Sequence, residues 1–197
     1  MQGNKHEIED LWEIVRKDYR IKEFLGAGTY GSVYRVKHRT TKKEYAIKLV
    51  KDLFLTPTHS RFMVRELTIL RKLSLMKQNV FTTKITDIIL AGPEDSFEAI
   101  FIVMEYQPND LKKLLSSNDI LFEEEHALFV LYNLLCGLNF LHSANIMHRD
   151  LKPGNILVNS DCQIQICDFG MARGFVKNDG GPNDLNHKDT AVASDSE

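Results

Sequence analysis

Residues 148–155 read HRDLKPGN, and they place an acid, an ammonium group and a terminal amide within eight positions. They follow a largely apolar run at residues 138–141 (LNFL). Pro153 prevents a regular helix here, so we expect a loop. A short polar run of this kind is most often a solvated loop. It gains a chemical function only if complementary groups occur elsewhere in the chain.

A glycine-rich turn is the first complementary feature. Gly26, Gly28 and Gly31 match the pattern G-x-G-x-x-G. Such glycines let backbone N–H groups approach phosphate oxygens without a side chain in the way, although alone the pattern is a weak signal. A dinucleotide-binding Rossmann site needs a helix to begin here, whereas residues 33–36 (VYRV) continue as a strand. The glycines are therefore expected to form a hairpin flap, which fits the phosphates of a mononucleotide.

Two charged residues fall at apolar positions. Lys48 alternates with Ala46 and Val50 in a strand pattern, so its side chain points to the face that these two share. On a helix, Glu66 has only apolar neighbours three and four positions away. Either charge alone would more often be a surface residue. An ionised glutamate in an apolar stripe is costly unless it is paired, so we predict an ion pair between Lys48 and Glu66.

An acid follows the last strand-like run of the chain. Asp168 comes directly after residues 163–167 (QIQIC) and precedes a Phe-Gly pair. An acid in this position is commonly a turn former. Taken with Asp150 and Asn155, however, Asp168 supplies oxygen ligands of the kind that Mg²⁺ accepts. We therefore predict that these loops share a magnesium-binding function.

The elements that must position these residues divide the chain into two parts. In the first part, short alternating runs joined by turns predict an antiparallel meander with one helix. The second part opens with helical patterns, so we expect a two-lobed α+β protein with its joint near residues 105–110. The predicted strands are 21–25, 33–37, 44–50, 84–90 and 99–106, and the predicted helices are 60–73, 111–115 and 123–142.

Composition argues against several classes of protein. The 197 residues are 43% hydrophobic with a formal net charge of −2, so we expect neither nucleic acid nor a membrane as a partner. The most apolar stretch, residues 127–141, is interrupted by polar side chains and predicts a buried helix. Three cysteines without metal-ligand spacing favour a reducing compartment. We expect an intracellular protein, cytoplasmic and/or nuclear.

Taken in order, these motifs resemble the signature of the eukaryotic protein kinases. The resemblance runs from about Tyr19 to about Gly174. Residues 141–147 (LHSANIM) and 166–173 (ICDFGMAR) are similar to the mitogen-activated protein kinases, which are serine/threonine kinases. Cyclin-dependent kinases are near relatives, but their cyclin-contacting helix sequence is not seen around Glu66. The matching motifs are Gly26-x-Gly28-x-x-Gly31-x-Val33, Ala46-Ile47-Lys48, Glu66, His148-Arg149-Asp150 with Asn155, and Asp168-Phe169-Gly170.

The resemblance implies a protein-kinase-like bilobal α+β fold after an N-terminal extension at residues 1–18. Residues 19–106 would form an N-lobe with a five-stranded antiparallel sheet and one long helix. Residues 107–173 would start a mainly helical C-lobe, and residues 174–197, rich in Asn, Asp, Gly and Ser, would be a disordered part of the activation segment. In the family the domain continues well past this segment. The kinase domain at 19–197 is therefore expected to be incomplete, truncated within the activation segment.

The resemblance also implies residue roles, with ATP and Mg²⁺ as cofactors. Asp150 would accept or orient the proton of the substrate hydroxyl, and Lys152 would reach the transferred phosphate. Lys48, paired with Glu66, would hold the α- and β-phosphates. The metal ligands would be Asn155 and Asp168, and the nucleotide-contacting residues would be Leu25, Gly26, Ala27, Gly28, Thr29, Tyr30, Gly31, Val33, Ala46, Lys48, Met104, Glu105, Gln107 and Leu157.

The implied function is that of an ATP-dependent serine/threonine protein kinase in mitogen-activated-type signalling. It would transfer the γ-phosphate of Mg-ATP to a Ser or Thr hydroxyl of a protein, and an upstream kinase would act on it. The alternative is a truncated, catalytically inactive module that binds nucleotide or competes for partners, because the substrate-gripping part of the family's domain is not in this sequence. A small-molecule phosphotransferase is disfavoured by the protein-kinase form of HRDLKPGN.

Overall fold

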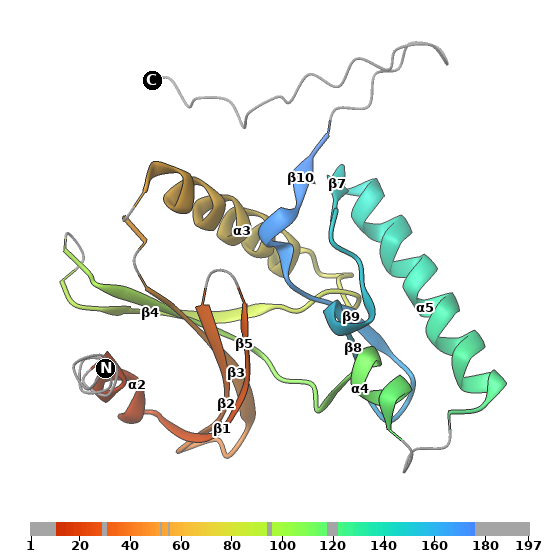
Figure 1. Ribbon diagram of the computed structural model, residues 1–197, viewed down its shortest axis with the longest axis horizontal. Helices are drawn as coiled ribbons and strands as arrows, with labels where there is room; N and C mark the ends of the chain where they lie inside the picture. Colours follow the sequence, from red (N-terminus) through yellow and green to blue (C-terminus); the bar gives the residue numbers. More distant parts are fainter. Residues whose placement is uncertain are drawn as a thin grey trace.

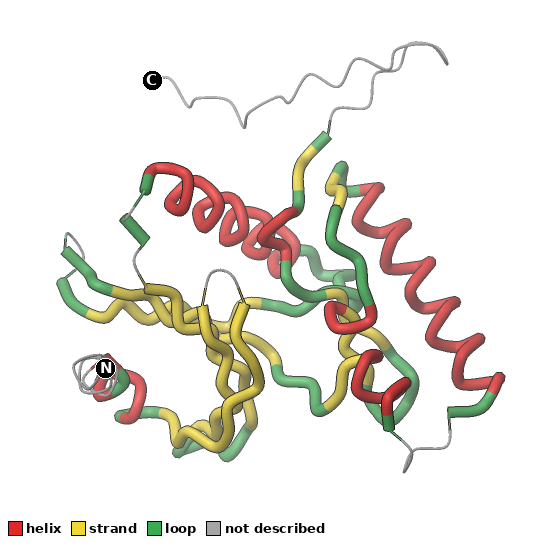
Figure 2. Tube along the Cα trace, viewed as in Figure 1, coloured by secondary structure: helices red, strands yellow, loops and turns green. Residues whose placement is uncertain are grey.

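A computed structural model describes residues 11–28, 31–51, 53–54, 56–93, 96–117 and 122–175. Five of its strands form one sheet in the N-terminal part, and the long helices α3 and α5 lie outside that sheet (Figures 1 and 2). The predicted two-part α+β architecture is confirmed. The predicted residues Thr29 and Tyr30 and nearly all of the segment 174–197 lie outside the described residues.

The N-lobe contains the predicted five-stranded sheet, with strand order β1-β2-β3-β5-β4. Every neighbouring pair is antiparallel. Only β1, β2 and β3 form a simple meander, because the chain passes through helix α3 after β3 and β5 then lies between β3 and β4. β1 shifts its register against β2 twice, between Ile21 and Glu23 and between Phe24 and Gly26. The strands are β1 (Tyr19–Gly28), β2 (Gly31–His38), β3 (Glu44–Lys51), β4 (Ile85–Ala91) and β5 (Ala99–Glu105).

Helix α3 (Pro57–Leu75) packs against one face of this sheet. It starts three residues before the predicted helix, because its first turn has its own signals. The Thr56 hydroxyl accepts a hydrogen bond from the His59 N–H at 3.2 Å, and Pro57 occupies the first turn, where no backbone donor is needed. The buried face of the helix consists of Met63, Glu66, Ile69, Leu70 and Leu73.

The opposite face of the sheet is covered by the short helix α2 (Glu13–Arg16) and the residue before it. Trp12 is 3% exposed, and its ring meets Tyr34 and Phe101 edge-on at 4.9 and 4.8 Å. Val15 is fully buried in the same cluster. The division into an extension (1–18) and a domain stays a prediction, but the end of that extension contributes to the N-lobe core.

We expect Trp12→Ala to lower the free energy of unfolding by about 3 kcal/mol, because the indole contacts are lost and a cavity remains. Urea unfolding followed by circular dichroism measures the change. Glu13→Ala, which alters an exposed side chain of the same segment, is the control and should change little. An unchanged midpoint for Trp12→Ala would place residues 1–18 outside the folded unit.

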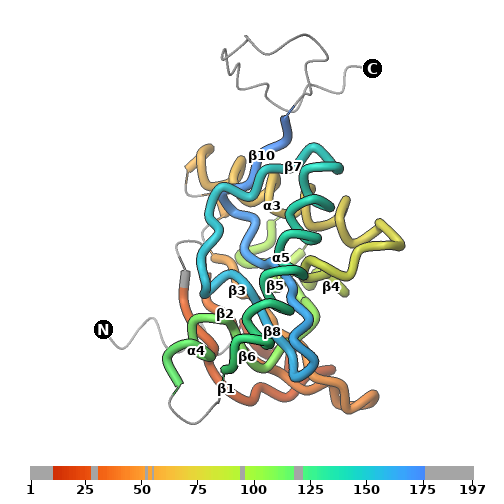
Figure 3. Tube along the Cα trace, turned by 90° about the vertical axis from the view of Figure 1, so that its right-hand side faces the viewer, coloured from red at the N-terminus to blue at the C-terminus, as the bar shows by residue number. Residues whose placement is uncertain are grey.

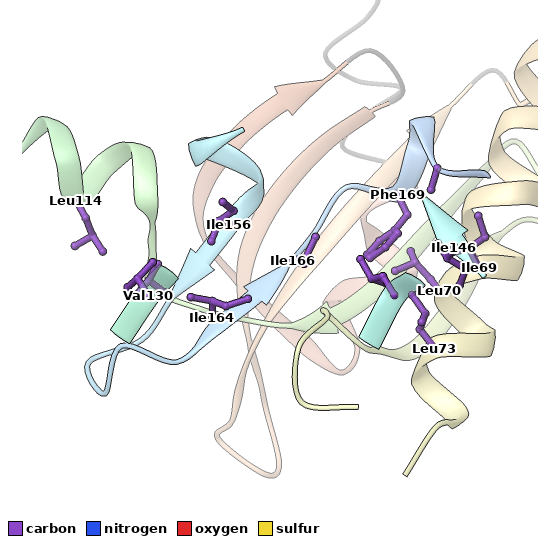
Figure 4. Close-up of a cluster of buried hydrophobic side chains, with 13 residues drawn as sticks. Ile69, Leu70, Leu73, Leu114, Val130, Ile146, Ile156, Ile164, Ile166 and Phe169 are labelled. Carbon is purple, nitrogen blue, oxygen red and sulfur yellow. The ribbon is translucent and has the colours of Figure 1, made fainter. Parts of the chain in front are cut away.

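The second part of the chain starts with two helices and continues as short strands and turns. Its core includes side chains of α3, so the two parts share apolar contacts: Figure 4 shows Leu70 and Leu73 beside Phe169. Figure 3 shows β7 and β10 paired near the end of α5. The elements are β6 (Asn109–Asp110), α4 (Leu111–Ser116), α5 (Glu124–Ser143), β7 (Ile146–Met147), η1 (Pro153–Asn155), β8 (Ile156–Val158), β9 (Ile164–Ile166), η2 (Phe169–Met171) and β10 (Arg173–Gly174).

The outer face of α5 is apolar and open to solvent. Its large side chains are each more than half exposed, whereas Val130, Gly137 and Leu141 on the inner face are buried. None of the described helices combines the length and the apolar character that crossing a membrane requires. The residues of this α5 outer face are Leu128, Phe129, Leu131, Tyr132 and Leu135.

Candidate active site

Lys48 and Glu66 form the predicted ion pair. The Lys48 Nζ lies 2.6 Å from Glu66 Oε1, and the two side chains are 13% and 3% exposed. β3 presents Lys48 on the same face as the buried Ala46 and Val50, and α3 presents Glu66 from the middle of its buried face. The pair therefore joins the sheet to the only long helix among the described N-lobe residues, in a largely water-free position where each charge depends on the other.

Strand register places several predicted nucleotide-contacting residues in adjacent rows. Val33 lies opposite Lys48 across β2 and β3, and Ala46 lies opposite Met104 across β3 and β5. Residues that face each other across antiparallel strands share one side of the sheet. The face that carries Lys48 therefore also carries the predicted contacts to the base. Leu25 and Ala27 lie on β1, Glu105 ends β5, Gln107 follows it, and Leu157 lies on β8.

Gly26 and Gly31, on either side of the turn between β1 and β2, are required for different physical reasons. A Cβ at Gly31 would lie 2.2 Å from the Leu49 carbonyl oxygen, and the φ of Gly31 is +154°. The close packing of β2 on β3 therefore requires glycine at this position. At Gly26 an added Cβ would meet no heavy atom within 4 Å. Packing does not explain Gly26, so a ligand that approaches the backbone is the better reason for it.

The two glycines can be separated by substitution. We expect Gly31→Ala to lower the free energy of unfolding by about 1–3 kcal/mol, because the new methyl group displaces β3. Gly26→Ala should leave stability unchanged and weaken ATP binding alone. Thermal unfolding and titration with ATP measure the two effects. Equal loss of stability in both variants would contradict the assignment of Gly31 to packing and of Gly26 to the approach of a ligand.

The loop at residues 148–155 gathers two polar side chains around the Asp150 carboxylate. Lys152 Nζ donates to Asp150 Oδ2 at 2.7 Å, and Asn155 Nδ2 donates to the same oxygen at 3.1 Å and to the Asp150 carbonyl at 2.9 Å. The hydrogen bond from Lys152 is the main cause that lowers the pKa of Asp150. The carboxylate is therefore ionised at neutral pH. The structure brings these three predicted residues together.

His148 fixes this loop to the strand before Asp168. Its Nδ1 accepts from the Asp150 N–H at 3.3 Å, so its Nε2 carries the proton that is donated to the Cys167 carbonyl at 2.9 Å. Burial lowers the pKa of His148 below its ordinary value of 6.5, although the Cys167 carbonyl and the carboxylates of Asp168 and Asp150 favour the charged form; Lys152 disfavours it. The imidazole is therefore neutral in the folded protein at neutral pH.

A pH dependence of stability follows from His148. Between its lowered pKa and 6.5 the unfolded state binds more protons than the folded state, so stability rises with pH in this window. We expect the contribution of His148 to the free energy of unfolding to have its full value above pH 6.5 and to decrease as the pH drops below 6.5. Urea unfolding at several pH values tests this. His148→Tyr should remove the component; an unchanged slope in that variant would assign it to other groups.

The turn at Asp168 connects the two sets. Asp168 adopts a left-handed backbone (φ 62°, ψ 74°), which turns the chain so that Phe169 points inward. Phe169 is fully buried, meets the ring of His148 edge-on at 5.0 Å, and belongs to the same core as Leu70 and Leu73 of α3. The helix that carries Glu66 and the loop that carries Asp150 therefore pack on one aromatic side chain.

Both Lys48 and Lys152 act electrostatically on Cys167, the residue directly before this turn. Burial raises the pKa of the Cys167 thiol to about 12, with the carboxylates of Asp168 and Asp110 acting in the same direction. Lys48 of the N-lobe and Lys152 of the second part both act against that shift. One point beside Asp168 therefore experiences the positive charge of both lysines, an arrangement suited to a polyanionic ligand such as a nucleotide phosphate.

The sequence pattern of the family described as "Protein kinase domain" matches residues 19–192. The chain belongs to the protein kinase family.

Individual kinases of similar sequence come from plants. "Mitogen-activated protein kinase 2" of Arabidopsis thaliana is 39% identical over 165 residues, which cover 84% of this chain and 42% of the relative. "Mitogen-activated protein kinase 16" of the same plant is 41% identical over 155 residues, or 79% of this chain and 26% of the relative. "Mitogen-activated protein kinase homolog 1" of Petunia hybrida is 39% identical over 165 residues. The chain thus spans about two fifths of the length of the first of these kinases.

The residues of this kinase domain suit a magnesium ion. The Asp168 carboxylate is exposed and has no hydrogen bond or ion pair to the described part of the chain. Asn155 uses its Nδ2 toward Asp150, so its amide oxygen is the atom left to meet a cation. No cluster of three or more His, Cys, Asp or Glu among the described residues could hold a metal. Mg²⁺ commonly takes one or two carboxylates together with phosphate oxygens, so these two side chains fit an ion that arrives with a nucleotide.

Two side-chain contacts to the hinge, one from Gln165 and one from Arg35, were not predicted from the sequence. Gln165 Nε2 on β9 donates to Glu105 Oε2 at 3.1 Å, across 60 residues of sequence. Arg35 on β2 places its Cζ 5.0 Å from the centre of the Tyr106 ring. Strand alternation from Val33 could have assigned Arg35 to the face of the sheet that carries Lys48. No sequence signal indicated its partner.

Proposed function

We propose that this chain contains the ATP-binding and catalytic-loop part of a serine/threonine protein kinase of the mitogen-activated type. The proposed reaction is transfer of the γ-phosphate of Mg-ATP to a Ser or Thr hydroxyl of a protein. The observation that carries the proposal is the 2.6 Å ion pair between Lys48 and Glu66, which holds an ammonium group on the largely apolar face of the sheet. Family membership supports the same reading.

In the proposed reaction each polar side chain has a defined task. Asp150 is ionised and accepts or orients the proton of the substrate hydroxyl. Lys152, which is paired with Asp150 at rest, is free to turn toward the transferred phosphate because its side chain is 55% exposed. Lys48, held by Glu66, meets the α- and β-phosphates. Phosphoryl transfer of this kind asks the protein for positioning and charge, which these groups supply.

The metal ion would be held by Asn155 and Asp168. When bound, Mg²⁺ neutralises negative charge on the phosphates. The protein's own contribution is to keep the two oxygen ligands at fixed positions. The Asn155 N–H donates to the Lys152 carbonyl at 2.9 Å, and the Cys167 N–H donates to the Asn155 carbonyl at 3.0 Å, so the two ligand-bearing segments are tied together. The nucleotide set predicted above, from Leu25 to Leu157, completes the proposed site.

The proposed partners are a protein substrate with a Ser or Thr acceptor and an upstream kinase. The names of the similar plant proteins support this class of partner. We place the protein inside the cell, in the cytoplasm and/or the nucleus, because Cys136, Cys162 and Cys167 are unpaired in the structure. Nucleic acid and membrane partners are not part of the proposal.

A catalytically inactive module that binds nucleotide or competes for partners is the second candidate. The observation that favours it is the α5 outer face, an apolar surface larger than isolated side chains would create. The two candidates differ in one measurement. Incubation of the purified 197-residue chain with ATP labelled at the γ-phosphate and a generic basic protein tests for transfer. Transfer that depends on Asp150 supports the kinase, and nucleotide binding without transfer supports the inactive module.

A further inference from the structure

Arg35 is the centre of a charged network on the nucleotide-facing side of the sheet. Its Nη2 donates to both carboxylate oxygens of Glu44 at 2.8 and 2.9 Å, and its Nε donates to Glu44 at 3.1 Å. Its Nη1 donates to Glu23 at 3.2 Å. The same guanidinium lies over the Tyr106 ring. One side chain therefore contacts β1, β3 and the hinge at once.

The position of this network relates it to the base end of the proposed nucleotide site. Arg35 lies directly opposite Ala46 in the pairing of β2 with β3, and Ala46 lies opposite Met104 in turn. Val33, two residues earlier on β2, shares this face by alternation. Tyr106 follows Glu105, the last residue of β5. Arg35 thus occupies the row that holds Ala46 and Met104 and borders the hinge.

The hinge is held from both sides. On one side Gln165 donates to the Glu105 carboxylate, and on the other side Arg35 covers Tyr106. A guanidinium suits the second task because its planar fork can bind a carboxylate with two donors while its face lies on an aromatic ring. A lysine side chain carries the same charge but lacks the planar, forked donor geometry of the guanidinium. Arg35 can therefore fix the distance between the β1–β2 hairpin and the hinge, which is the space that a base would enter.

We propose that Arg35 is a positioning residue for the base of the nucleotide, acting through Tyr106 and Glu44 without touching the ligand itself. This inference rests on the proposed function, since it needs a nucleotide in the cleft. The role differs from that of Lys48, which acts on the phosphates. Loss of Arg35 would loosen the base end of the site and leave the phosphate end intact.

The decisive experiment compares adenosine with ATP as probes of the full chain. Arg35→Met keeps the apolar stem and removes both the fork and the contact with Tyr106. We expect it to weaken the binding of adenosine and of ATP by the same factor, about fivefold. An effect of this size is consistent with the loss of a cation–π contact and a bidentate ion pair. Arg35→Lys should restore part of the affinity. Lys37→Met is the matched control: it removes a cation from the same face, and no ion pair of Lys37 is seen among the described residues.

A double-mutant cycle tests the route of action. If Arg35 acts through Tyr106, then Arg35→Met should have a much smaller effect in a Tyr106→Leu background, because the two changes remove one interaction. Full additivity of the two effects would overturn the proposal, as would equal adenosine affinity in Arg35→Met and in the unchanged chain. An Arg35→Met variant that loses affinity for ATP but not for adenosine would assign Arg35 to the phosphates instead. Absence of ATP binding in the unchanged chain would overturn the proposed function, and this inference with it.

Discussion

Lys48→Met is expected to lower the free energy of unfolding by about 3–5 kcal/mol, because it leaves a buried carboxylate without its partner. Glu66 is only 3% exposed and is surrounded by the apolar residues of α3, so water cannot replace the lost ammonium group. The same change should abolish tight binding of ATP while adenosine still binds, because the proposed role of Lys48 is to meet the phosphates. Urea unfolding measures the first effect, and calorimetric titration with each ligand measures the second.

A second variant separates the two consequences of the change at Lys48. Replacing both partners, Lys48→Met with Glu66→Met, removes the unpaired charge and should recover most of the stability. It should not recover ATP binding. Lys51→Met on the same strand is the control for loss of a β3 lysine, and it should leave both properties unchanged. Wild-type stability in Lys48→Met, with and without Mg-ATP, would contradict the pairing and the proposed site together.

Asp150→Asn should reduce phosphate transfer by about 10²–10⁴-fold, the usual contribution of a positioned acid or base. The amide keeps the size of the side chain but cannot take up a proton, and it loses the charge that holds Lys152 at 2.7 Å. Affinity for ATP should stay within about twofold of the wild type, since the carboxylate is assigned to the acceptor hydroxyl and not to the nucleotide.

Single-turnover transfer of labelled phosphate to a basic protein measures this effect. Asp161→Asn, in the exposed turn between β8 and β9, is the matched control and should transfer at the wild-type rate. Equal transfer by Asp150→Asn and the wild type would remove Asp150 from the mechanism. A wild-type chain that binds ATP and transfers nothing would favour the inactive nucleotide-binding module.

Much of the fold could be predicted because its elements have clear periods. Alternating runs indicated the first three strands of the sheet and two further runs indicated the others, and each predicted strand overlaps the observed one. The Lys48–Glu66 pair could be predicted for a related reason: a charge at an apolar position of a regular element requires a counter-charge. The first turn of α3 was missed because residues 57–59 (PTH) carry capping signals and no apolar period.

Contacts between distant segments could not be predicted in the same way. Trp12 stood in a charged stretch, and nothing in the sequence showed that it would pack on Tyr34 and Phe101. Arg35 and Tyr106 lie 71 positions apart and meet only because β3 and β5 are neighbours in the sheet. Such pairings depend on strand order, which periodicity alone does not determine.

Backbone conformation at the site also escaped prediction. Arg149 and Asp168 both have positive φ, 69° and 62°, a region that is uncommon for residues other than glycine, although Asp adopts it more often than Arg does. Neighbouring contacts hold them there, including the buried Phe169 and the hydrogen bonds of His148. The left-handed turns follow from tertiary packing. They lie beside Asp150 and Asn155, and strained backbone conformations of this kind are concentrated at functional sites.

The α5 outer face has a thermodynamic consequence. Its five large apolar side chains already meet water in the folded chain, so unfolding hydrates less additional apolar surface than the length of the protein suggests. The heat-capacity increment of unfolding scales with newly hydrated apolar area. The curve of stability against temperature should therefore be flatter for this chain than for one of equal length whose α5 is covered.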